Sequence, residues 1–526
     1  MSNGYLLFLL HCHLPFVRHP EHPRFLEEDW LFEGVSETYL PLLRVIDRLR
    51  EARTTVRLTV SVSPTLLTML SDELLQERYT RHLERLLELA GKEVERTRGQ
   101  PHFNRLAWMY LDLFSRNYED YTSKYKRNIV PELVRFQELG LLELITSAAT
   151  HSYLPLLEKY PTAVDAQIRL AVELHEKVMG SRPRGIWLPE CGYFPGLEEF
   201  LKKNGLEYFF VDTHGILFAD RRPSYGNFAP IVCENGTAAF GRDPEASRAV
   251  WSAEEGYPGD ISYREFYRDI GYDLPLEYIR PYIHEGDVRI NTGIKYYAIT
   301  GPGDRKRPYD REEALGKVEE HSENFIYRRR KQFERISELM DRPPLIVAPF
   351  DAELFGHWWF EGPEWLESLF TKLDQSAPEL KLVTPLEYLS LYRDNQTATP
   401  SYSSWGNKGY SEVWLSGSND WIYRHVHKAV ERMSRLAKLF VSTNGVRRRA
   451  LNQAARELML MQASDWPFIM KTGTTVPYAV KRIREHIFNF NKIYDTLLTN
   501  QLDLAWLTRV EARNNIFPDI DYRIFS

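Results

Sequence analysis

The sequence contains few cysteines and no long hydrophobic segment. Only three cysteines occur among its 526 residues, Cys12, Cys191 and Cys233, and their wide spacing excludes the closely paired cysteines of redox and zinc motifs. The apolar run at residues 5–10 ends at His11 and follows no basic leader, so it is too short for a signal peptide or a membrane span. We therefore expect a cytoplasmic protein in a reducing compartment, with no membrane partner.

An excess of basic residues is absent as well. The chain has 67 Lys and Arg against 73 Asp and Glu, which gives a net charge of -6 at pH 7. Binding to nucleic acid depends on a basic surface that neutralises phosphates, so nucleic acid is not an expected partner. With 43% hydrophobic and 27% charged residues the chain can bury a sizeable core, and its length predicts two or three domains.

Aromatic residues, in contrast, are abundant. The 12 Trp, 30 Tyr and 27 Phe make up 13% of the chain, and many of them stand in polar, Gly-rich or Pro-rich stretches. Core packing explains most single aromatic residues. Sugar rings also present apolar C–H faces that stack on aromatic planes, so aromatic residues in loops suit a carbohydrate groove.

Short apolar runs that end in polar or small residues recur along the chain. Such a run is typical of a buried parallel strand whose C-terminal end opens into a loop. The runs are residues 5–10, 56–62, 141–145, 185–188, 208–211, 345–349 and, more weakly, 380–383. Helical patterns lie between most of them, for example at residues 39–51, 163–179 and 311–340. This alternation predicts an α/β fold with barrel-like closure and an active site at the polar strand ends.

Two regions interrupt the alternation of strands and helices. Residues 73–139 are long, charged and helix-patterned, so we interpret them as a helical insertion. Residues 395–526 begin with a linker-like stretch and continue with an almost wholly helical pattern, which predicts a helical C-terminal domain. Residues 1–394 remain for the barrel domain.

Two carboxylates end predicted strands in matched contexts. Glu190 follows Trp187-Leu188-Pro189, and Asp351 follows Pro349-Phe350. A single acidic residue at a strand end is usually a helix N-cap or a surface charge. Two of them at one barrel mouth indicate catalysis, because cleavage of a glycosidic bond needs one carboxylate to attack and a second carboxyl group to protonate the leaving oxygen. Asp351 would need a raised pKa for the second role.

His11 and His13 lie two positions apart at a predicted strand end, so both point to one face while Cys12 points away. Such a pair is more often structural or substrate-binding than metal-ligating. The alternative from another class is a metal-dependent carbohydrate deacetylase, in which His151 or His214 completes the ligand set. That mechanism leaves Glu190 without a role.

Several segments resemble the signature segments of glycoside hydrolase family 57. They are His11-Cys12-His13-Leu14-Pro15, Trp187-Leu188-Pro189-Glu190 and the run at residues 348–359, Ala-Pro-Phe-Asp-Ala-Glu-Leu-Phe-Gly-His-Trp-Trp. The resemblance extends to residues 251–252, 256–259, 404–406 and 464–466, and so covers nearly the whole chain. The segment around Asp351 is the most specific of these.

The resemblance implies a seven-stranded (β/α) barrel, a helical insertion and a helical C-terminal domain that closes over the cleft. It also implies retention of the α configuration, Glu190 as nucleophile, Asp351 as acid/base, and no metal or other cofactor. By the same motif matching, the residues that resemble the lining of the substrate groove are His11, His13, Trp30, Arg242, Trp251, His357, Trp405, Trp414 and Asp465. Core packing remains the alternative for each of these tryptophans.

The family contains both glycogen branching enzymes and hydrolases. Branching requires the 6-hydroxyl of a second glucan to react in preference to water, so the site must exclude water, for example with a mobile lid. Residues 220–227, with Tyr225 between Pro and Gly, resemble the loop of the branching enzymes. Together with Trp405 and Trp414, this loop favours branching of amylose, amylopectin or glycogen. A hydrolysing α-amylase or 4-α-glucanotransferase is the alternative, and a catalytically dead glycan-binding protein is a further one.

Overall fold

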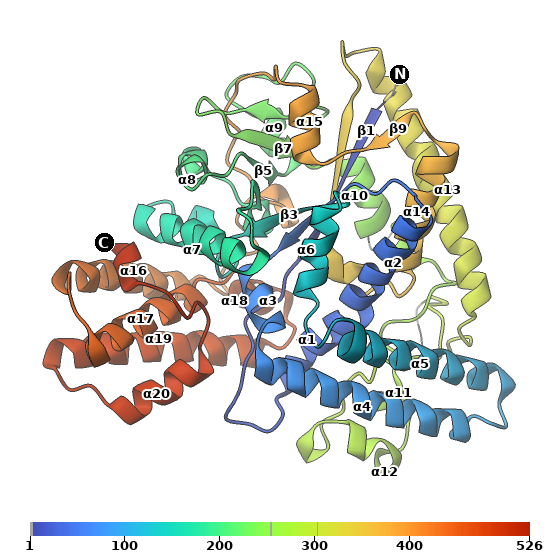
Figure 1. Cartoon of the computed structure of the whole chain (residues 1–526), viewed down its shortest axis with the longest axis horizontal. Coiled ribbons are helices and arrows are strands. Elements are labelled where there is room, and N and C mark those ends of the chain that lie inside the picture. Colours follow the sequence, from blue (N-terminus) through green and yellow to red (C-terminus); the bar gives the residue numbers. More distant parts are fainter. Residues whose placement is uncertain (1–3, 253–254, 302, 304) are drawn as a thin grey trace.

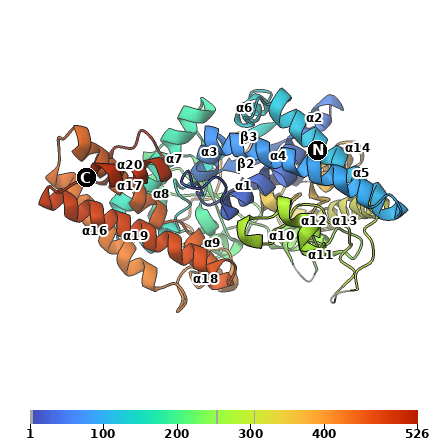
Figure 2. The same cartoon turned by 90° about the horizontal axis from the view of Figure 1, so that it is seen from below.

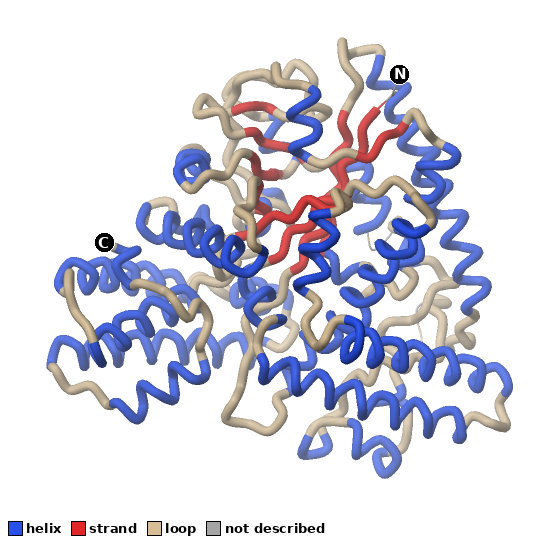
Figure 3. The backbone as a smooth tube through the Cα atoms, viewed as in Figure 1, coloured by secondary structure: helices blue, strands red, loops and turns tan. Residues whose placement is uncertain are grey.

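The protein is described by a computed structural model that covers residues 4–252, 255–301, 303 and 305–526 (Figure 1). A curved sheet runs through the middle of the molecule, with helices on its outside (Figure 3). The strands in the described residues are β1 (Gly4–Cys12), β2 (Leu58–Val62), β3 (Leu142–Ser147), β4 (Gly185–Trp187), β5 (Tyr208–Val211), β6 (Ile231–Val232), β7 (Ala238–Gly241), β8 (Leu345–Asp351) and β9 (Leu380–Leu382).

The sheet has the order β6-β7-β5-β4-β3-β2-β1-β8, and β9 pairs with the start of β1. All pairs from β7 through to β8 are parallel, as expected when helices connect successive strands, and only β6 runs antiparallel to its neighbour. The sheet curls into a half-barrel, and just after β7 the backbone N–H of Asp243 donates to the carbonyl oxygen of Val347 on β8 (2.8 Å). The predicted α/β barrel-like class is confirmed.

Every strand expected from the apolar runs is present, and the expected helices at residues 39–51, 163–179 and 311–340 correspond to α2, α7 and α13. The β6–β7 hairpin was not predicted, because strands of two and four residues are too short to show a pattern. The helices outside the insertion and the C-terminal region are α1 (Asp29–Glu33), α2 (Leu40–Glu51), α3 (Pro64–Leu70), α7 (Pro161–Met179), α8 (Leu197–Lys203), α9 (Thr213–Leu217), α10 (Pro244–Trp251), α11 (Ile270–Asp273), α12 (Leu276–Ile279), α13 (Arg311–Ser337), α14 (Gly362–Ser376) and α15 (Pro385–Leu391).

Residues 73–139 are mainly helical, with α4 (Glu73–Arg96), α5 (Pro101–Glu119) and α6 (Val130–Glu138). The α4–α5 pair and the C-terminal helices lie at opposite ends of the molecule (Figure 2). The C-terminal helices are α16 (Trp421–Leu439), α17 (Gly445–Met461), α18 (Asp465–Thr472), α19 (Val476–Thr499) and α20 (Leu504–Arg513). No helix in the described part of the chain combines the length and apolarity needed to cross a membrane.

The C-terminal region reaches the polar ends of the strands at two points. The backbone N–H of Trp405 donates to the carbonyl oxygen of Glu190 (2.8 Å), just after β4. The backbone N–H of Ser464, between α17 and α18, donates to the carbonyl oxygen of His151 (2.9 Å), just after β3. These two contacts bring late parts of the chain to the mouth of the sheet.

Glu457 on α17 joins the C-terminal helices through a fully buried carboxylate. It accepts hydrogen bonds from His486 on α19 (2.7 Å), from Asn514 (2.8 Å) and from Gln453 (2.8 Å). A buried carboxylate is tolerated only when such donors satisfy it, so the hydrogen-bonded group acts as a unit.

We predict that Glu457→Ala lowers the free energy of unfolding by about 3–5 kcal/mol, because it leaves buried donors without an acceptor. Glu431→Ala is the control, since Glu431 makes an ion pair on the surface of α16 and its loss should change the free energy of unfolding little. Urea denaturation of the two variants measures the difference, and equal effects would contradict this role of Glu457.

Candidate active site

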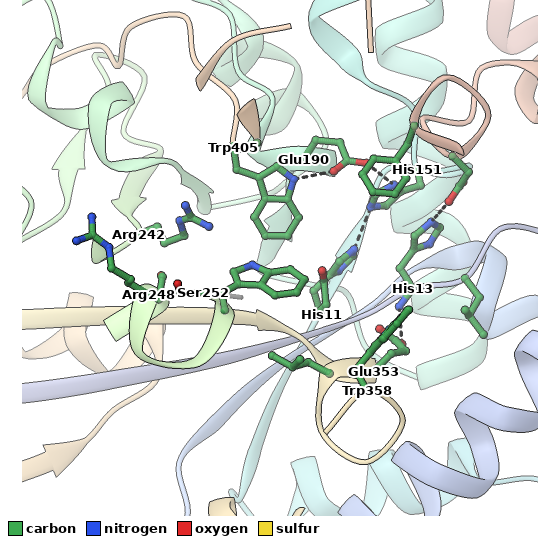
Figure 4. Close-up of a pocket in the computed structure, with 18 of the residues that line it drawn as sticks. His11, His13, His151, Glu190, Arg242, Arg248, Ser252, Glu353, Trp358 and Trp405 are labelled. Atoms are coloured by element: carbon green, nitrogen blue, oxygen red, sulfur yellow. Dashed lines mark hydrogen bonds and ion pairs between the residues drawn. The ribbon is translucent and has the colours of Figure 1, made fainter. Parts of the chain in front are cut away.

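A pocket of about 760 Å³ lies at the C-terminal ends of the parallel strands (Figure 4). Its wall combines residues that follow β1, β3, β4, β7 and β8 with residues of the C-terminal region, among them Trp405, Asp465 and Phe468. Eight of the predicted site residues line it, namely His11, His13, Glu190, Arg242, Trp251, Asp351, Trp405 and Asp465. The strand ends and the C-terminal region therefore build one site together.

Glu190 stands in a strained turn directly after β4. Its φ of 62° and the φ of 51° at Cys191 place two consecutive non-glycine residues in the left-handed region. Oε2 of the carboxylate accepts a hydrogen bond from Nε1 of Trp405 (2.7 Å), and Oε1 accepts one from Oγ of Ser464 (2.9 Å). Burial raises the pKa of Glu190, and these two donors oppose the rise.

Asp351 is the last residue of β8 and lies beside His11 of β1 in the parallel register. Burial and the nearby carboxylates of Glu353 and Glu190 raise the pKa of Asp351 well above its usual value. The pocket thus holds one carboxyl group that receives two hydrogen bonds and another that is driven toward its protonated form. This difference is what an acid and a nucleophile acting at neutral pH require.

Glu353 also lines the pocket, although its role was not anticipated from the sequence. The backbone N–H of His13 donates to its carboxylate (3.2 Å), and the hydroxyl of Tyr39 donates to the same oxygen. Burial raises the pKa of Glu353 to about 7. Glu353 lies in the single 3-10 turn at Ala352–Leu354 that follows β8, and its place in the segment at residues 348–359 was the available signal.

The histidines at the strand ends form a hydrogen-bonded group. Nε2 of His11 and Nε2 of His151 are 2.9 Å apart, and Nε2 of His13 is 3.0 Å from Oδ1 of Asp465. Nδ1 of His13 lies 2.8 Å from Oγ of Ser63. Burial lowers the pKa of both His11 and His151 well below the usual value, so these two imidazoles are neutral at neutral pH.

The metal-dependent alternative needs an open set of ligands. Ligand atoms of His13, His151 and Asp465 do lie within 4.8 Å of one another. The ring nitrogens of both histidines, however, already have hydrogen-bond partners within the protein. His214, the other suggested ligand, lies apart and bonds to the carbonyl oxygen of Gly409. We therefore do not identify a metal site here.

Aromatic side chains form an exposed rim around the pocket, which we call the aromatic rim and define as Trp251, Trp358 and Phe468. Their exposed fractions are 42%, 51% and 43%, which is high for side chains of this size. Trp358 stacks on Phe266 with ring centroids 4.2 Å apart, so it is held in place while one face stays free. Rigid aromatic planes beside carboxyl groups suit the binding of sugar rings.

Arg242 connects the charged and aromatic parts of the wall. Its guanidinium forms an ion pair with Asp212 (3.0 Å) and lies over the ring of Trp405 (5.7 Å). Two contacts therefore fix the Trp405 ring, namely the guanidinium of Arg242 over its face and the hydrogen bond from its Nε1 to Glu190.

Three predicted groove residues lie outside the pocket lining. Trp414 is buried and stacks on Tyr153 (4.6 Å), and Trp30 meets Tyr478 edge to face (5.7 Å). His357 bonds through Nδ1 to Glu37 (2.9 Å). For both tryptophans the structure supports the core-packing alternative.

The structure does not place Tyr225 at the pocket. Its hydroxyl donates to Asp341 (2.6 Å), and the guanidinium of Arg342 lies over its ring (4.8 Å). Both partners precede β8, and Tyr225 is not among the residues that line the pocket. Residues 220–227 connect α9 to β6, and a lid formed by this segment stays a prediction.

Two contacts to Glu190 could not be predicted from the sequence, because they come from segments that are distant along the chain. Ser464 and His151 both act on Glu190, yet they are separated from it by 274 and 39 residues along the chain. Ser464 was visible only as a neighbour of Asp465 in the segment at residues 464–466. Phe468 shows no local sequence signal that separates it from a core residue.

Two family models match the chain. The model for Glycosyl hydrolase family 57 matches residues 7–401, and the model for 1,4-alpha-glucan branching enzyme, C-terminal, matches residues 425–525. A curated 1,4-alpha-glucan branching enzyme of Thermococcus kodakarensis is 33% identical over 98% of this chain and 78% of its own length.

Solved structures are similar over the full length. The alpha-amylase AmyC of Thermotoga maritima is 47% identical with a TM-score of 0.94, and the match covers 100% of this chain and 99% of that one. The GH57-type branching enzyme of Pyrococcus horikoshii is 34% identical with a TM-score of 0.88, and the match covers 99% and 97% of the two chains.

We predict that Glu353→Gln lowers the pKa of Asp351, because it removes a negative charge that disfavours the ionised form. Infrared titration of the carboxyl band measures the shift, with Asp351→Asn identifying the band. Glu387→Gln, at the start of α15, is the control and should leave the band unchanged. An unshifted Asp351 titration in Glu353→Gln would exclude this coupling.

Proposed function

The chain belongs to glycosyl hydrolase family 57, and we propose that it is a retaining 1,4-alpha-glucan branching enzyme. The observation that carries the chemistry is the pair Glu190 and Asp351 in one aromatic pocket, where Glu190 accepts two hydrogen bonds and Asp351 faces two other carboxyl groups. The family resemblance drawn from the sequence is confirmed. The residue roles below are our proposal.

In the first half-reaction, a carboxylate oxygen of Glu190 attacks the anomeric carbon of an α-1,4-linked glucosyl unit. The bond from that carbon to the leaving oxygen breaks, and Asp351 gives its proton to this oxygen, so the departing glucan leaves as an alcohol. The donor chain is then held as an ester on Glu190. The raised pKa of Asp351 favours the protonated form that this step requires.

In the second half-reaction, the ionised Asp351 takes the proton of a 6-hydroxyl on another glucan. The oxygen of that hydroxyl attacks the anomeric carbon, the ester bond breaks, and Glu190 returns as a carboxylate. Two inversions at the same carbon retain the α configuration. Nothing in this sequence of steps requires a cofactor.

The other pocket residues bind and orient the glucan. Trp251, Trp358 and Phe468 offer apolar planes for successive sugar rings, and His13 and Asp465 offer polar atoms for hydroxyl groups. Polymers of α-1,4-linked glucose, namely amylose, amylopectin and glycogen, are the proposed substrates. The long groove that such chains need agrees with an open pocket that is shared by two parts of the molecule.

Transfer and hydrolysis differ only in what attacks the ester. The match of residues 425–525 to the C-terminal region of branching enzymes supports transfer. Hydrolysis is the second candidate, because the relative from Thermotoga maritima is an alpha-amylase and because Tyr225 does not cover this pocket. Exclusion of water would then depend on the aromatic rim.

Substitution of the two carboxyl groups tests the proposed roles. Glu190→Gln should reduce activity on amylose to the uncatalysed background, because the amide is not a nucleophile. Asp351→Asn should reduce kcat by about 10²–10⁴-fold, because neither half-reaction retains its proton transfer. The control is Asp112→Asn, which alters an exposed carboxylate on α5 and should keep full activity. Near-normal turnover by either of the first two variants would refute the assignment.

The products distinguish branching from hydrolysis. After incubation with amylose, proton NMR should show new α-1,6 linkages while few new reducing ends appear. This result follows if a 6-hydroxyl, and not water, takes the chain from Glu190. Reducing ends without α-1,6 linkages would instead identify an α-amylase.

A further inference from the structure

Ser464 directly precedes α18, but its side chain makes no hydrogen bond to that helix. It is the N-cap residue by position, yet its hydroxyl makes no capping hydrogen bond. The hydroxyl instead donates to Oε1 of Glu190 (2.9 Å). Ser464 is itself buried and does not line the pocket, so it contacts Glu190 from the side that faces away from the pocket. A cap residue whose side chain is directed elsewhere suggests a different task.

The direction of the hydrogen bonds behind Ser464 is fixed by chemistry. A carboxylate only accepts, so the Ser464 hydroxyl donates to it and accepts from Nδ1 of His151 (2.8 Å). The imidazole of His151 is neutral, so its Nε2 accepts from Nε2 of His11 (2.9 Å). Nδ1 of His11 lies 3.1 Å from Oγ of Ser61, whose single proton can be donated either to this nitrogen or to the carbonyl oxygen of Thr146 (3.2 Å). One tautomer of each histidine satisfies the bonds from His11 through His151 and Ser464 to Glu190.

His151 is held in this position by strained backbone. Its φ of 55° lies in the left-handed region, which is uncommon for a residue with a side chain. Two backbone hydrogen bonds secure it, from its own N–H to Ala148 (2.9 Å) and to its carbonyl oxygen from Ser464 (2.9 Å). Strain that the surroundings maintain is common where a side chain must be aimed accurately.

We propose that Ser464 is a positioning residue for the nucleophile, aimed by His151 and His11 so that Glu190 stays ionised and correctly oriented for attack. The inference rests on the proposed function, since it assigns a role to a residue that acts through Glu190. It also means that the junction of α17 and α18 completes the active site. Trp405 fixes the other carboxylate oxygen, so each oxygen has one donor and keeps a lone pair for the reaction.

Several titratable and charged groups face Glu190 and set its ionisation together with Ser464. They are Asp351 on β8, Asp465 on α18, His13 after β1, His151 after β3 and Arg242 after β7. Substitution of Ser464 leaves all of them in place. Loss of the Ser464 hydroxyl removes a hydrogen bond that stabilises the ionised form of Glu190, so the pKa of Glu190 rises. As the pH is lowered, the variant therefore loses activity at a higher pH than the parent enzyme does.

The test compares Ser464→Ala with Ser464→Thr in the full-length protein. Ser464→Ala should move the acid limb of the kcat/KM profile on amylose upward by about one pH unit and lower kcat by roughly tenfold. KM should stay unchanged, because Ser464 does not line the pocket. Ser464→Thr keeps the hydroxyl and should restore the acid limb. Thr472→Ala, which removes an exposed hydroxyl from the same helix, is the matched control and should change neither quantity.

The histidine chain is tested by a double substitution. His11→Asn should shift the acid limb in the same direction but by less, and it should add no further shift in the Ser464→Ala background, because its effect on the limb passes through Ser464. If the shifts of the acid limb caused by His11→Asn and Ser464→Ala were additive, the inference would be wrong. The same holds if Ser464→Ala were active with an unchanged acid limb. Either result would leave the proposed function standing. A parent enzyme without activity on α-glucans would overturn the proposed function and this inference with it.

Discussion

The active site depends on hydrogen bonds that a late part of the chain makes to the Glu190 carboxylate. Trp405 and Ser464, which donate to its two oxygens, stand 215 and 274 positions later in the sequence. A carboxylate buried to this degree is unfavourable unless donors satisfy it. The C-terminal region is therefore needed for the chemistry as well as for the shape of the groove, and the strained turn after β4 presents both oxygens to it.

The second constraint is the concentration of negative charge at the mouth of the sheet. Glu190, Asp351 and Glu353 share one buried wall, and three ionised carboxylates cannot coexist there cheaply. Glu190 and Glu353 each accept two hydrogen bonds, and the pKa of Asp351 is raised well above its usual value, which favours its protonated form. The same two residue types thus acquire opposite roles from their surroundings, as in other enzymes that cleave glycosidic bonds.

The strands and the position of Glu190 and Asp351 could be predicted because the information is local. A buried parallel strand is a short apolar run, and a polar residue that ends it lies at the mouth of the sheet. His11 and His13 followed from the same rule, and the structure places both in the pocket with Cys12 on the apolar side of β1. Motif resemblance supplied the family and the proposed roles, which composition alone could not give.

The remaining site residues could not be predicted because they depend on packing between distant segments. Nothing in the residues around Trp414 distinguishes a ring that stacks on Tyr153 from one that faces a sugar. The composition of a mobile lid and that of an ordinary surface turn are the same, and in the folded chain Tyr225 bonds to Asp341. Ser464 was hidden for the opposite reason, since a serine before a helix usually caps it.

Trapping of the covalent intermediate tests the central claim most directly. A 5-fluoro-α-glycosyl fluoride forms the ester quickly and releases it slowly, so mass spectrometry of the digested protein locates the attached sugar. We expect a single adduct on the peptide that contains Glu190, and none in Glu190→Gln. An adduct on Asp351 or on another residue, or turnover of the reagent without any adduct, would contradict a glycosyl-enzyme intermediate at Glu190.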